Sequence, residues 1–256
     1  MNHARPHVPG REGIELVLVD FDDTIVETAP RFQNARRRLF ELLVAAGFDA
    51  DACERLHYEE VDPSMLHRFG LGPGRLVHSF PETYRRLCVA IGRAPEDATV
   101  AELIALARGV AGTPPLLDGA LHALERLARA LPTVVYTQSG EPDYQLECLR
   151  EAGVLDVVGR DHVRVTDVKT GARLREALDE LGVSDPSAAW MIGNSIRSDV
   201  NPALEIGANA ILIQIDDPWH HDEVEPIRTG FPSVRSLAEA ASLLLASEPD
   251  PKPWPR

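Results

Sequence analysis

The sequence predicts an α/β protein, a doubly wound parallel sheet with an all-helical segment inserted into it. Beyond residue 113, short apolar segments alternate with segments of helical periodicity, which is typical of parallel strands covered by helices on both faces. Residues 28–112 contain helical patterns without a strand signal. An apolar strand predicted over residues 14–19 precedes this helical segment, so its partner strands are expected to follow it.

The domain boundaries follow from the order of these patterns. Within the insertion, apolar residues recur at intervals of three and four, and the glycine-rich residues 70–74 predict a loop. The helices predicted there span residues 31–47, 50–69 (interrupted at Asp62-Pro63), 81–92 (with Pro81 in the first turn) and 100–109. In the remainder, strands are predicted over residues 132–137, 162–166, 188–192 and 210–215, and helices over residues 118–130, 142–152, 170–181 and 198–206. We therefore expect a discontinuous α/β core (13–27 and 113–246), a helical insertion (28–112) and flexible tails (1–12 and 247–256).

The charge balance of the chain excludes some classes of partner. Of its 256 residues, 26 are lysine or arginine and 40 are aspartate or glutamate, so the net charge is −14. Nucleic acids and anionic membranes bind basic surfaces, and we therefore expect neither as a partner. We expect no transmembrane helix, because the sequence contains no apolar run of about 18 residues, and no signal peptide, because residues 1–11 are polar. Its three widely spaced cysteines are expected to be free thiols, which favours a cytoplasmic protein.

Three carboxylates stand close together directly after the first predicted strand, in Asp20-Phe-Asp22-Asp23-Thr24. Like charges a few ångströms apart raise one another's pKa or need a cation between them. A bound divalent metal ion would offset this cost. The spacing of Asp20 and Asp22 also places both side chains on one side of an extended chain. These residues are therefore the first candidates for an active site.

Polar residues also follow the other predicted strands. They are Thr137, Gln138 and Ser139, then Lys169, and finally residues 194–199, which include Asn194 and Asp199. Ligands of parallel sheets bind at the carboxyl ends of the strands, so all these residues are expected to converge on one edge. Carboxylates, a hydroxyl group and a lysine at one edge suit phosphoryl transfer. In that reaction a carboxylate attacks phosphorus, a cation offsets charge on the phosphoryl oxygens and an acid protonates the leaving oxygen.

Four segments of the chain resemble, in order, the motifs of the haloacid dehalogenase superfamily of hydrolases. The first is Asp20-Phe-Asp22-Asp-Thr24, the second ends a strand at Thr137, the third is Lys169 and the fourth is Ile192-Gly-Asn194-Ser-Ile-Arg-Ser-Asp199. The helical segment between the first two motifs resembles a type-one cap. The resemblance covers roughly residues 14–216 and implies a Rossmann-like core with a helical cap.

The resemblance implies a role for each matching residue. Asp20 would be the nucleophile that forms an aspartyl-phosphate, and it would also bind Mg²⁺. Asp22 would act as general acid and then as general base, and its backbone carbonyl would bind the metal. The remaining roles are substrate binding by Thr137, Lys169 and the adjacent Gln138, and metal binding by Asn194 and Asp199.

Asn194 departs from the family pattern, in which the fourth motif often begins with aspartate. Its amide oxygen can bind Mg²⁺ but carries no charge. We therefore expect weaker metal affinity and a more important role for Asp199.

From these motifs we predict a Mg²⁺-dependent phosphatase that hydrolyses a small phosphorylated metabolite, as a monomer or a homodimer. A phosphomutase or a dehalogenase of the same superfamily is the alternative, although carbon–halogen displacement needs no acid such as Asp22. A catalytically weak binding or regulatory protein is a further alternative, which Asn194 suggests.

Other polar residues are expected to have structural roles. Asp23 is expected to stabilise the loop after the first strand. Arg36, Arg37 and Arg38 are expected to form one turn of a solvated helix face, with a substrate contact by one of them as the alternative. Residues 217–223, which include two adjacent histidines, are expected to form a polar loop at the rim of the site.

Overall fold

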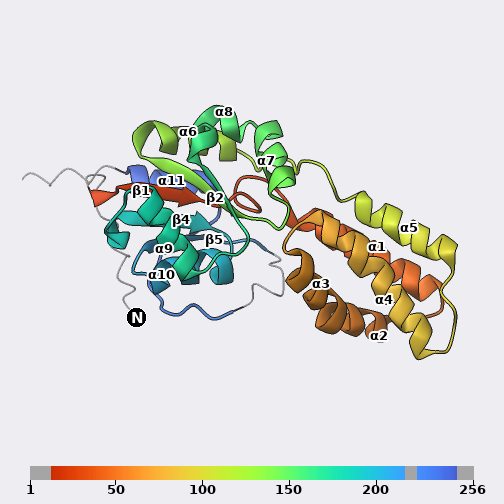
Figure 1. Ribbon diagram of the computed structural model, residues 1–256. Helices are drawn as coiled ribbons and strands as arrows, with labels where there is room; N and C mark the ends of the chain where they lie inside the picture. Colours follow the sequence, from red (N-terminus) through yellow and green to blue (C-terminus); the bar gives the residue numbers. More distant parts are fainter. Residues whose placement is uncertain (1–12, 217–223, 247–256) are drawn as a thin grey trace, which may run out of the picture.

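A computed structural model describes residues 13–216 and 224–246 of the chain. The predicted tails (1–12 and 247–256) and the predicted polar loop (217–223) lie outside the described residues. The chain forms a sheet covered by helices, and a further group of helices lies beside it (Figure 1). The predicted α/β class is thereby confirmed.

The sheet has six parallel strands in the order β3-β2-β1-β4-β5-β6. They span Leu16–Val19 (β1), Thr133–Gln138 (β2), Val163–Thr166 (β3), Ala189–Gly193 (β4), Asn209–Ile213 (β5) and Ser233–Val234 (β6). Val17 of β1 is in register with Thr133 on one side and Trp190 on the other. The chain thus proceeds outward from β1 in both directions, and the carboxyl end of β1 lies at the switch point where such sheets bind ligands.

Helices cover both faces of this sheet. They span Ala120–Ala130 (α6), Pro142–Glu151 (α7), Val154–Val158 (α8), Gly171–Glu180 (α9), Asn201–Glu205 (α10) and Leu237–Leu245 (α11). Val17 and Val19 of β1 pack with α6, α7, α8 and α11, whereas Leu16 and Leu18 pack with α9 and α10. All four side chains are buried. A strand covered on both faces needs a continuous apolar sequence, which is the pattern observed here.

The chain between β1 and β2 forms a helical block. Its α-helices span Ala29–Ala45 (α1), Ala50–Arg55 (α2), Asp62–Phe69 (α3), Leu76–Ala90 (α4) and Asp97–Arg108 (α5). They bury a hydrophobic cluster of their own, which includes Leu39, Leu43 and Leu103. This cluster is separate from the two clusters that flank the sheet. None of the described helices is long and apolar enough to cross a membrane.

The prediction that a helix begins at residue 81 is wrong. Helix α4 begins at Leu76, and Pro81 lies inside it. A proline within a helix removes one backbone hydrogen bond. Leu76 and Phe80 are fully buried in the hydrophobic cluster of the block, and their packing extends the helix ahead of the proline.

The predicted interruption at Asp62-Pro63 is also absent, because the chain stays helical there. A π-helical turn over Leu56–Val61 joins α2 to α3, and the backbone N–H of Asp62 bonds to the carbonyl of His57. The wider turn accommodates Pro63 at the start of α3. Three short elements that the sequence pattern did not predict are α8, β6 and α11.

Candidate active site

A cavity of about 940 Å³ lies at the carboxyl edge of the sheet, and residues of the core and the helical block both line it. Its walls include six of the predicted site residues, namely Asp20, Asp22, Gln138, Lys169, Asn194 and Asp199. They lie at the end of β2 or after β1, β3 and β4, and the carboxyl ends of these strands meet at this edge. The parallel topology therefore brings these six residues together.

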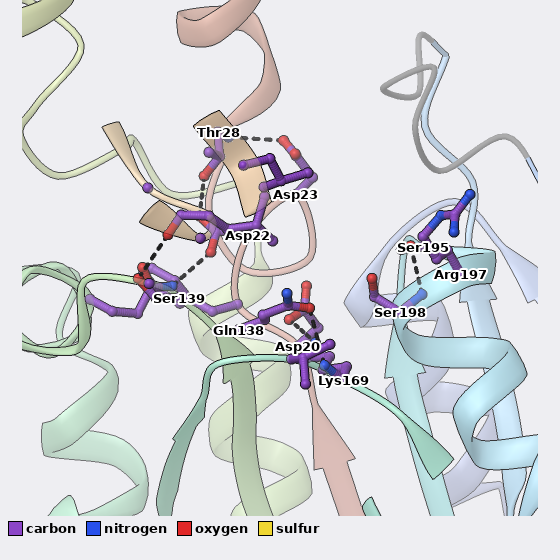
Figure 2. A pocket seen from close by; sticks show the side chains of 18 of the residues that line it. Asp20, Asp22, Asp23, Thr28, Gln138, Ser139, Lys169, Ser195, Arg197 and Ser198 are labelled. Carbon is purple, nitrogen blue, oxygen red and sulfur yellow. Dashed lines mark hydrogen bonds and ion pairs between the residues drawn. The ribbon is translucent and has the colours of Figure 1, made fainter. Parts of the chain in front are cut away.

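Lys169 connects two carboxylates of the site. Its Nζ atom donates hydrogen bonds to Oδ1 of Asp199 at 2.7 Å and to Oδ1 of Asp20, and Figure 2 shows Lys169 beside Asp20. All three side chains are more than nine-tenths buried. The backbone N–H of Lys169 donates to Oε1 of Gln138 at 3.2 Å. The predicted substrate-binding residue Gln138 thus helps to position the lysine.

The charges of this cluster depend on one another. Burial raises the pKa of Asp20 well above its usual range, and the adjacent Lys169 opposes this rise. Burial alone would lower the pKa of Lys169, but the charges of Asp199 and Asp20 outweigh it and raise that pKa. Lys169 is therefore a fixed positive charge at neutral pH, and it favours the ionised form of Asp20.

Asp22 is held by different partners. Its Oδ1 accepts a hydrogen bond from the Thr28 hydroxyl at 2.6 Å (Figure 2). Its Oδ2 accepts one from Nε2 of Gln145 at 2.7 Å. Burial raises the pKa of Asp22, and these two hydrogen bonds partly offset the rise. A carboxyl group with a raised pKa is suited to proton transfer near neutral pH.

Asp23 stabilises the loop after β1, as the sequence predicts. Its backbone is left-handed, with φ at 56°. Its Oδ1 accepts hydrogen bonds from the backbone N–H groups of Thr28 at 2.9 Å and Ala29 at 2.8 Å, so it caps the first turn of α1. Burial raises the pKa of Asp23 to about 6.

The loop after β4 positions Asp199. The backbone N–H of Ser195 donates to Oδ2 of Asp199 at 3.0 Å. A Cβ atom at Gly193 would lie 2.2 Å from the same oxygen, so this position requires glycine. Asn194 lines the cavity, and its Oδ1 accepts a long hydrogen bond of 3.5 Å from the Thr24 hydroxyl.

The oxygen atoms of Asp20, Asp199 and Asn194 are hard ligands of the kind that Mg²⁺ prefers. Within residues 13–216 and 224–246, no three His, Cys, Asp or Glu side chains form a group that could hold a metal ion. Asp20, Asp199 and Asn194 all line the cavity, and they are the side chains that would hold a metal ion here. These oxygen donors suit Mg²⁺. Because Asn194 is neutral, the site carries one negative charge fewer than it would with an aspartate at this position.

Thr137 is the predicted site residue that does not line the cavity. It is fully buried, and its hydroxyl oxygen accepts a hydrogen bond of 2.9 Å from Nε2 of Gln145. Sequence reasoning missed Gln145, which binds both Thr137 and Asp22. Gln145 lies on the buried face of α7 with Cys148 and Leu149, and a polar residue on such a face was the available signal.

The helical block forms the other wall of the cavity, which includes Arg36 and Arg75. Arg37 and Arg38 are exposed as predicted, but Arg36 is 5% exposed, so its placement on a solvated face is wrong. Its position on α1 turns it inward, toward the core of the block.

The glycine-rich loop of the block contacts the core beside this cavity. The backbone N–H of Gly140 donates to the carbonyl of Leu71 at 2.6 Å. The backbone N–H of Gly74 donates to Oε1 of Glu141 at 2.8 Å. A Cβ atom at Gly70 would lie 2.8 Å from Cα of Gly140. The two backbones therefore approach each other at a distance that only glycine allows.

Comparison with known proteins identifies the family. The model of the haloacid dehalogenase-like hydrolase family matches residues 14–207. The chain belongs to this family. This haloacid dehalogenase-like hydrolase is therefore an enzyme of the hydrolase class, and the predicted resemblance is confirmed.

The individual proteins that resemble this haloacid dehalogenase-like hydrolase match it over a short segment or at low sequence identity. It is 38% identical over 72 residues to a phospholysine phosphohistidine inorganic pyrophosphate phosphatase of Xenopus laevis, a match that spans 28% of this chain and only 26% of the relative. A haloacid dehalogenase-like hydrolase of Xanthomonas campestris has a similar structure, with a TM-score of 0.70 and 23% identity over 84% of this chain and 89% of that one. The structure of a putative HAD-hydrolase of Bacillus subtilis bound to magnesium is also similar. Its TM-score is 0.59, and it is 18% identical over 90% of this chain and 98% of that one. Both structures support the fold alone.

Proposed function

We propose that this hydrolase is a Mg²⁺-dependent phosphatase that acts on a small phosphate monoester through an aspartyl-phosphate at Asp20. The observation behind this proposal is the different environment of two carboxyl groups in one cavity. Asp20 has the cation of Lys169 beside it, as a nucleophile requires. Asp22 has a raised pKa and two hydrogen-bond donors, Thr28 and Gln145, as an acid–base group requires.

The reaction would proceed in two steps. In the first, Asp20 attacks phosphorus, the bond to the leaving oxygen breaks, and Asp22 gives its proton to that oxygen. In the second, Asp22 takes a proton from water, the water oxygen attacks phosphorus, and phosphate leaves as Asp20 is restored. Lys169 offsets negative charge on the phosphoryl oxygens. Mg²⁺ held by Asp20 and its neighbours would supply further positive charge when bound.

The hydrogen bonds to Asp22 also favour phosphate transfer over dehalogenation. Displacement of halide needs no proton donor, whereas an alkoxide leaving group does. The similarity to a phosphatase over 72 residues supports the same choice. In this proposal the helical block acts as a cap that closes over the bound substrate, excludes bulk water from the cavity and sets specificity.

Substitution of the nucleophile tests the proposal. Asp20→Asn should reduce phosphate release from p-nitrophenyl phosphate by at least about a thousandfold, with an unchanged circular dichroism spectrum. Asp118→Asn, at an exposed aspartate of the core, is the matched control and should keep its activity. Full activity of Asp20→Asn would contradict the mechanism. Release of one phosphate per alcohol formed distinguishes a phosphatase from a phosphomutase.

A further inference from the structure

Three apolar residues of the helical block, which we call the apolar wall, line the active-site cavity. They are Leu66, Phe69 and Leu71, and each is only partly buried. The three hydrophobic clusters of the described residues, one within the block and two beside the sheet, include none of them. Membership of a core therefore does not explain these side chains. Apolar surface that stays accessible on the wall of a cavity is typical of a ligand-binding site.

Helix α3 places two residues of the apolar wall on one side. Leu66 and Phe69 are three positions apart, so they lie about one turn apart on the same face of the helix. The ring of Phe69 stacks on the ring of His78, with centroids 4.3 Å apart and planes at 6°. Because His78 belongs to α4, this contact holds Phe69 against its own block. The apolar face of a helix usually packs on a core, whereas Leu66 and Phe69 border the cavity.

The apolar wall adjoins the catalytic edge of the sheet. The backbone N–H of Gly140 donates to the carbonyl of Leu71 at 2.6 Å. A Cβ atom at Gly140 would lie 2.2 Å from the carbonyl oxygen of Phe69. Gly140 is two residues beyond Gln138, the last residue of β2. A substrate whose phosphate lies at Asp20 in the same cavity can therefore place its leaving group against the apolar wall.

Polar residues of the block also line the cavity. Arg36 and Arg75 offer a ligand little surface, because both are more than nine-tenths buried and pair with Asp62. Gln33 and His67 are more accessible than the two arginines. A polar group on the leaving group is therefore the alternative that an experiment must separate from an apolar one.

We propose that the apolar wall binds the leaving group of the substrate, and that this group is an uncharged alcohol or phenol with a mainly apolar body. Each methylene group that the wall removes from water would strengthen binding. The cavity of about 940 Å³ has the size of a site for a small organic ligand. The inference rests on the proposed phosphatase function and narrows its substrates, because a polyhydroxylated or charged leaving group would lose hydration against this wall.

Calorimetric titration with unreactive alkylphosphonates, in the presence of Mg²⁺, tests the apolar wall. Methyl-, propyl-, pentyl- and heptylphosphonate share a head group and differ in apolar length. The affinity of the wild type should rise about threefold for each methylene group that contacts the wall, and at least about tenfold from methyl- to heptylphosphonate.

A second pair of ligands tests the polar alternative. In 4-hydroxybutyl- and 6-hydroxyhexylphosphonate, a hydroxyl group replaces the terminal methyl group of pentyl- and heptylphosphonate. Each should bind the wild type about tenfold less tightly than its alkyl counterpart, because the hydroxyl group loses hydration against the wall.

Variants then locate the site. Leu66→Ala and Phe69→Ala should each reduce the gain in affinity from methyl- to heptylphosphonate by about fivefold to tenfold, and leave the affinity for methylphosphonate unchanged. Met65→Ala is the matched control, because Met65 is a partly buried residue of the same helix that does not line the cavity. Thermal unfolding reports whether each variant folds.

Three results would overturn the apolar wall as a binding site for the leaving group. One is a wild-type affinity that does not rise from methyl- to heptylphosphonate, and a lack of detectable binding by heptylphosphonate counts as this result. Another is binding of the hydroxylated ligands as tightly as their alkyl counterparts, or more tightly. The third is a gain with chain length that persists in folded Leu66→Ala and Phe69→Ala.

These results are independent of turnover, because phosphonates are not hydrolysed. Failure of the proposed phosphatase function would appear separately, as an absence of phosphate release from every ester.

Discussion

The side-chain amide of Gln145 donates a hydrogen bond of 2.7 Å to Asp22. Gln145 belongs to α7 of the core, whereas Thr28, the other partner of Asp22, directly precedes α1 of the helical block. The proposed acid–base group is thus held from both parts of the protein. Its geometry depends on how these parts sit against each other.

Removal of the Gln145 amide should slow the chemical step. Gln145→Leu deprives Asp22 of one of its two donors and should lower kcat by about 10- to 100-fold, with a smaller change in KM. Steady-state measurement of phosphate release separates the two parameters. Glu147→Gln, on an exposed part of the same helix, provides the control. An unchanged kcat in Gln145→Leu would show that Asp22 is oriented without it.

The charge of the fourth motif should set the affinity for metal. Chelation with EDTA should remove activity, and added Mg²⁺ should restore it. Asn194→Asp adds a carboxylate beside Asp20 and Asp199, and should lower the Mg²⁺ concentration for half-maximal activity by about tenfold. A Mg²⁺ titration of the wild type and the variant measures this shift. Activity that survives complete chelation would contradict the proposed metal dependence, and a phosphatase-inactive wild type would favour a binding or regulatory role.

The contact between Gly70 and Gly140 should be needed for activity. Gly70 and Gly92 both have a positive φ, of 72° and 68°, and the ψ of Gly70 is −171°. Alanine at either position should therefore cost about 1 kcal/mol of stability or more, with the larger cost at Gly70, whose backbone conformation is almost confined to glycine. A Cβ atom at Gly92 meets nothing within 4 Å, whereas one at Gly70 would lie 2.8 Å from Gly140. Gly70→Ala should separate the block from the core and lower kcat/KM by about tenfold, while Gly92→Ala should not. Similar activities of the two variants would contradict this expectation.

Asp23 should make stability depend on pH in the metal-free protein. Burial raises its pKa from 3.8 to about 6, so the folded protein binds this proton more tightly than the unfolded chain. The contribution of Asp23 to the free energy of unfolding therefore falls as pH rises from about 4 to 6. Asp23→Asn keeps a side-chain oxygen to cap α1 and tolerates the left-handed backbone, but it cannot ionise.

Urea unfolding in EDTA at pH 4 and pH 7 tests this expectation. The free energy of unfolding of Asp23→Asn, relative to the wild type, should increase by on the order of 1 kcal/mol between the two pH values. The full effect of the shift is reduced because Asp23 is partly exposed. A difference that stays constant with pH would show that Asp23 ionises normally.

The sheet and its acids could be predicted because they depend on local patterns. A continuous apolar run marks β1, and Asp20 and Asp22 follow it directly. The place of Arg36 could not be predicted in this way. Arg36 lies on the same helix as two exposed arginines, and tertiary contacts such as its pairing with Asp62 of another helix distinguish it.

Contacts between elements explain the remaining differences. Gln145 of α7 donates a hydrogen bond to Thr137 of β2, and no pattern in the sequence predicts this contact between two elements. At Pro81 a local rule about prolines predicts a helix start, but the packing of Leu76 and Phe80 outweighs it. Local patterns thus predicted which residues lie at the strand ends, whereas the residues that hold them in place could be identified only from the tertiary structure.

The start of α1 is connected by hydrogen bonds to Asp22, the proposed acid. Thr28 donates to Asp22 and to Asp23, and the backbone N–H of Glu27 donates to the carbonyl of Pro115 at 2.8 Å, where the chain returns to the core. A rotation of the helical block about these two connections would move Thr28 and change the proton affinity of Asp22. Because such coupling is reciprocal, the charge on Asp22 would in turn bias the orientation of the block. In the proposed mechanism, the protonation state of Asp22 would then depend on how the helical block lies against the core.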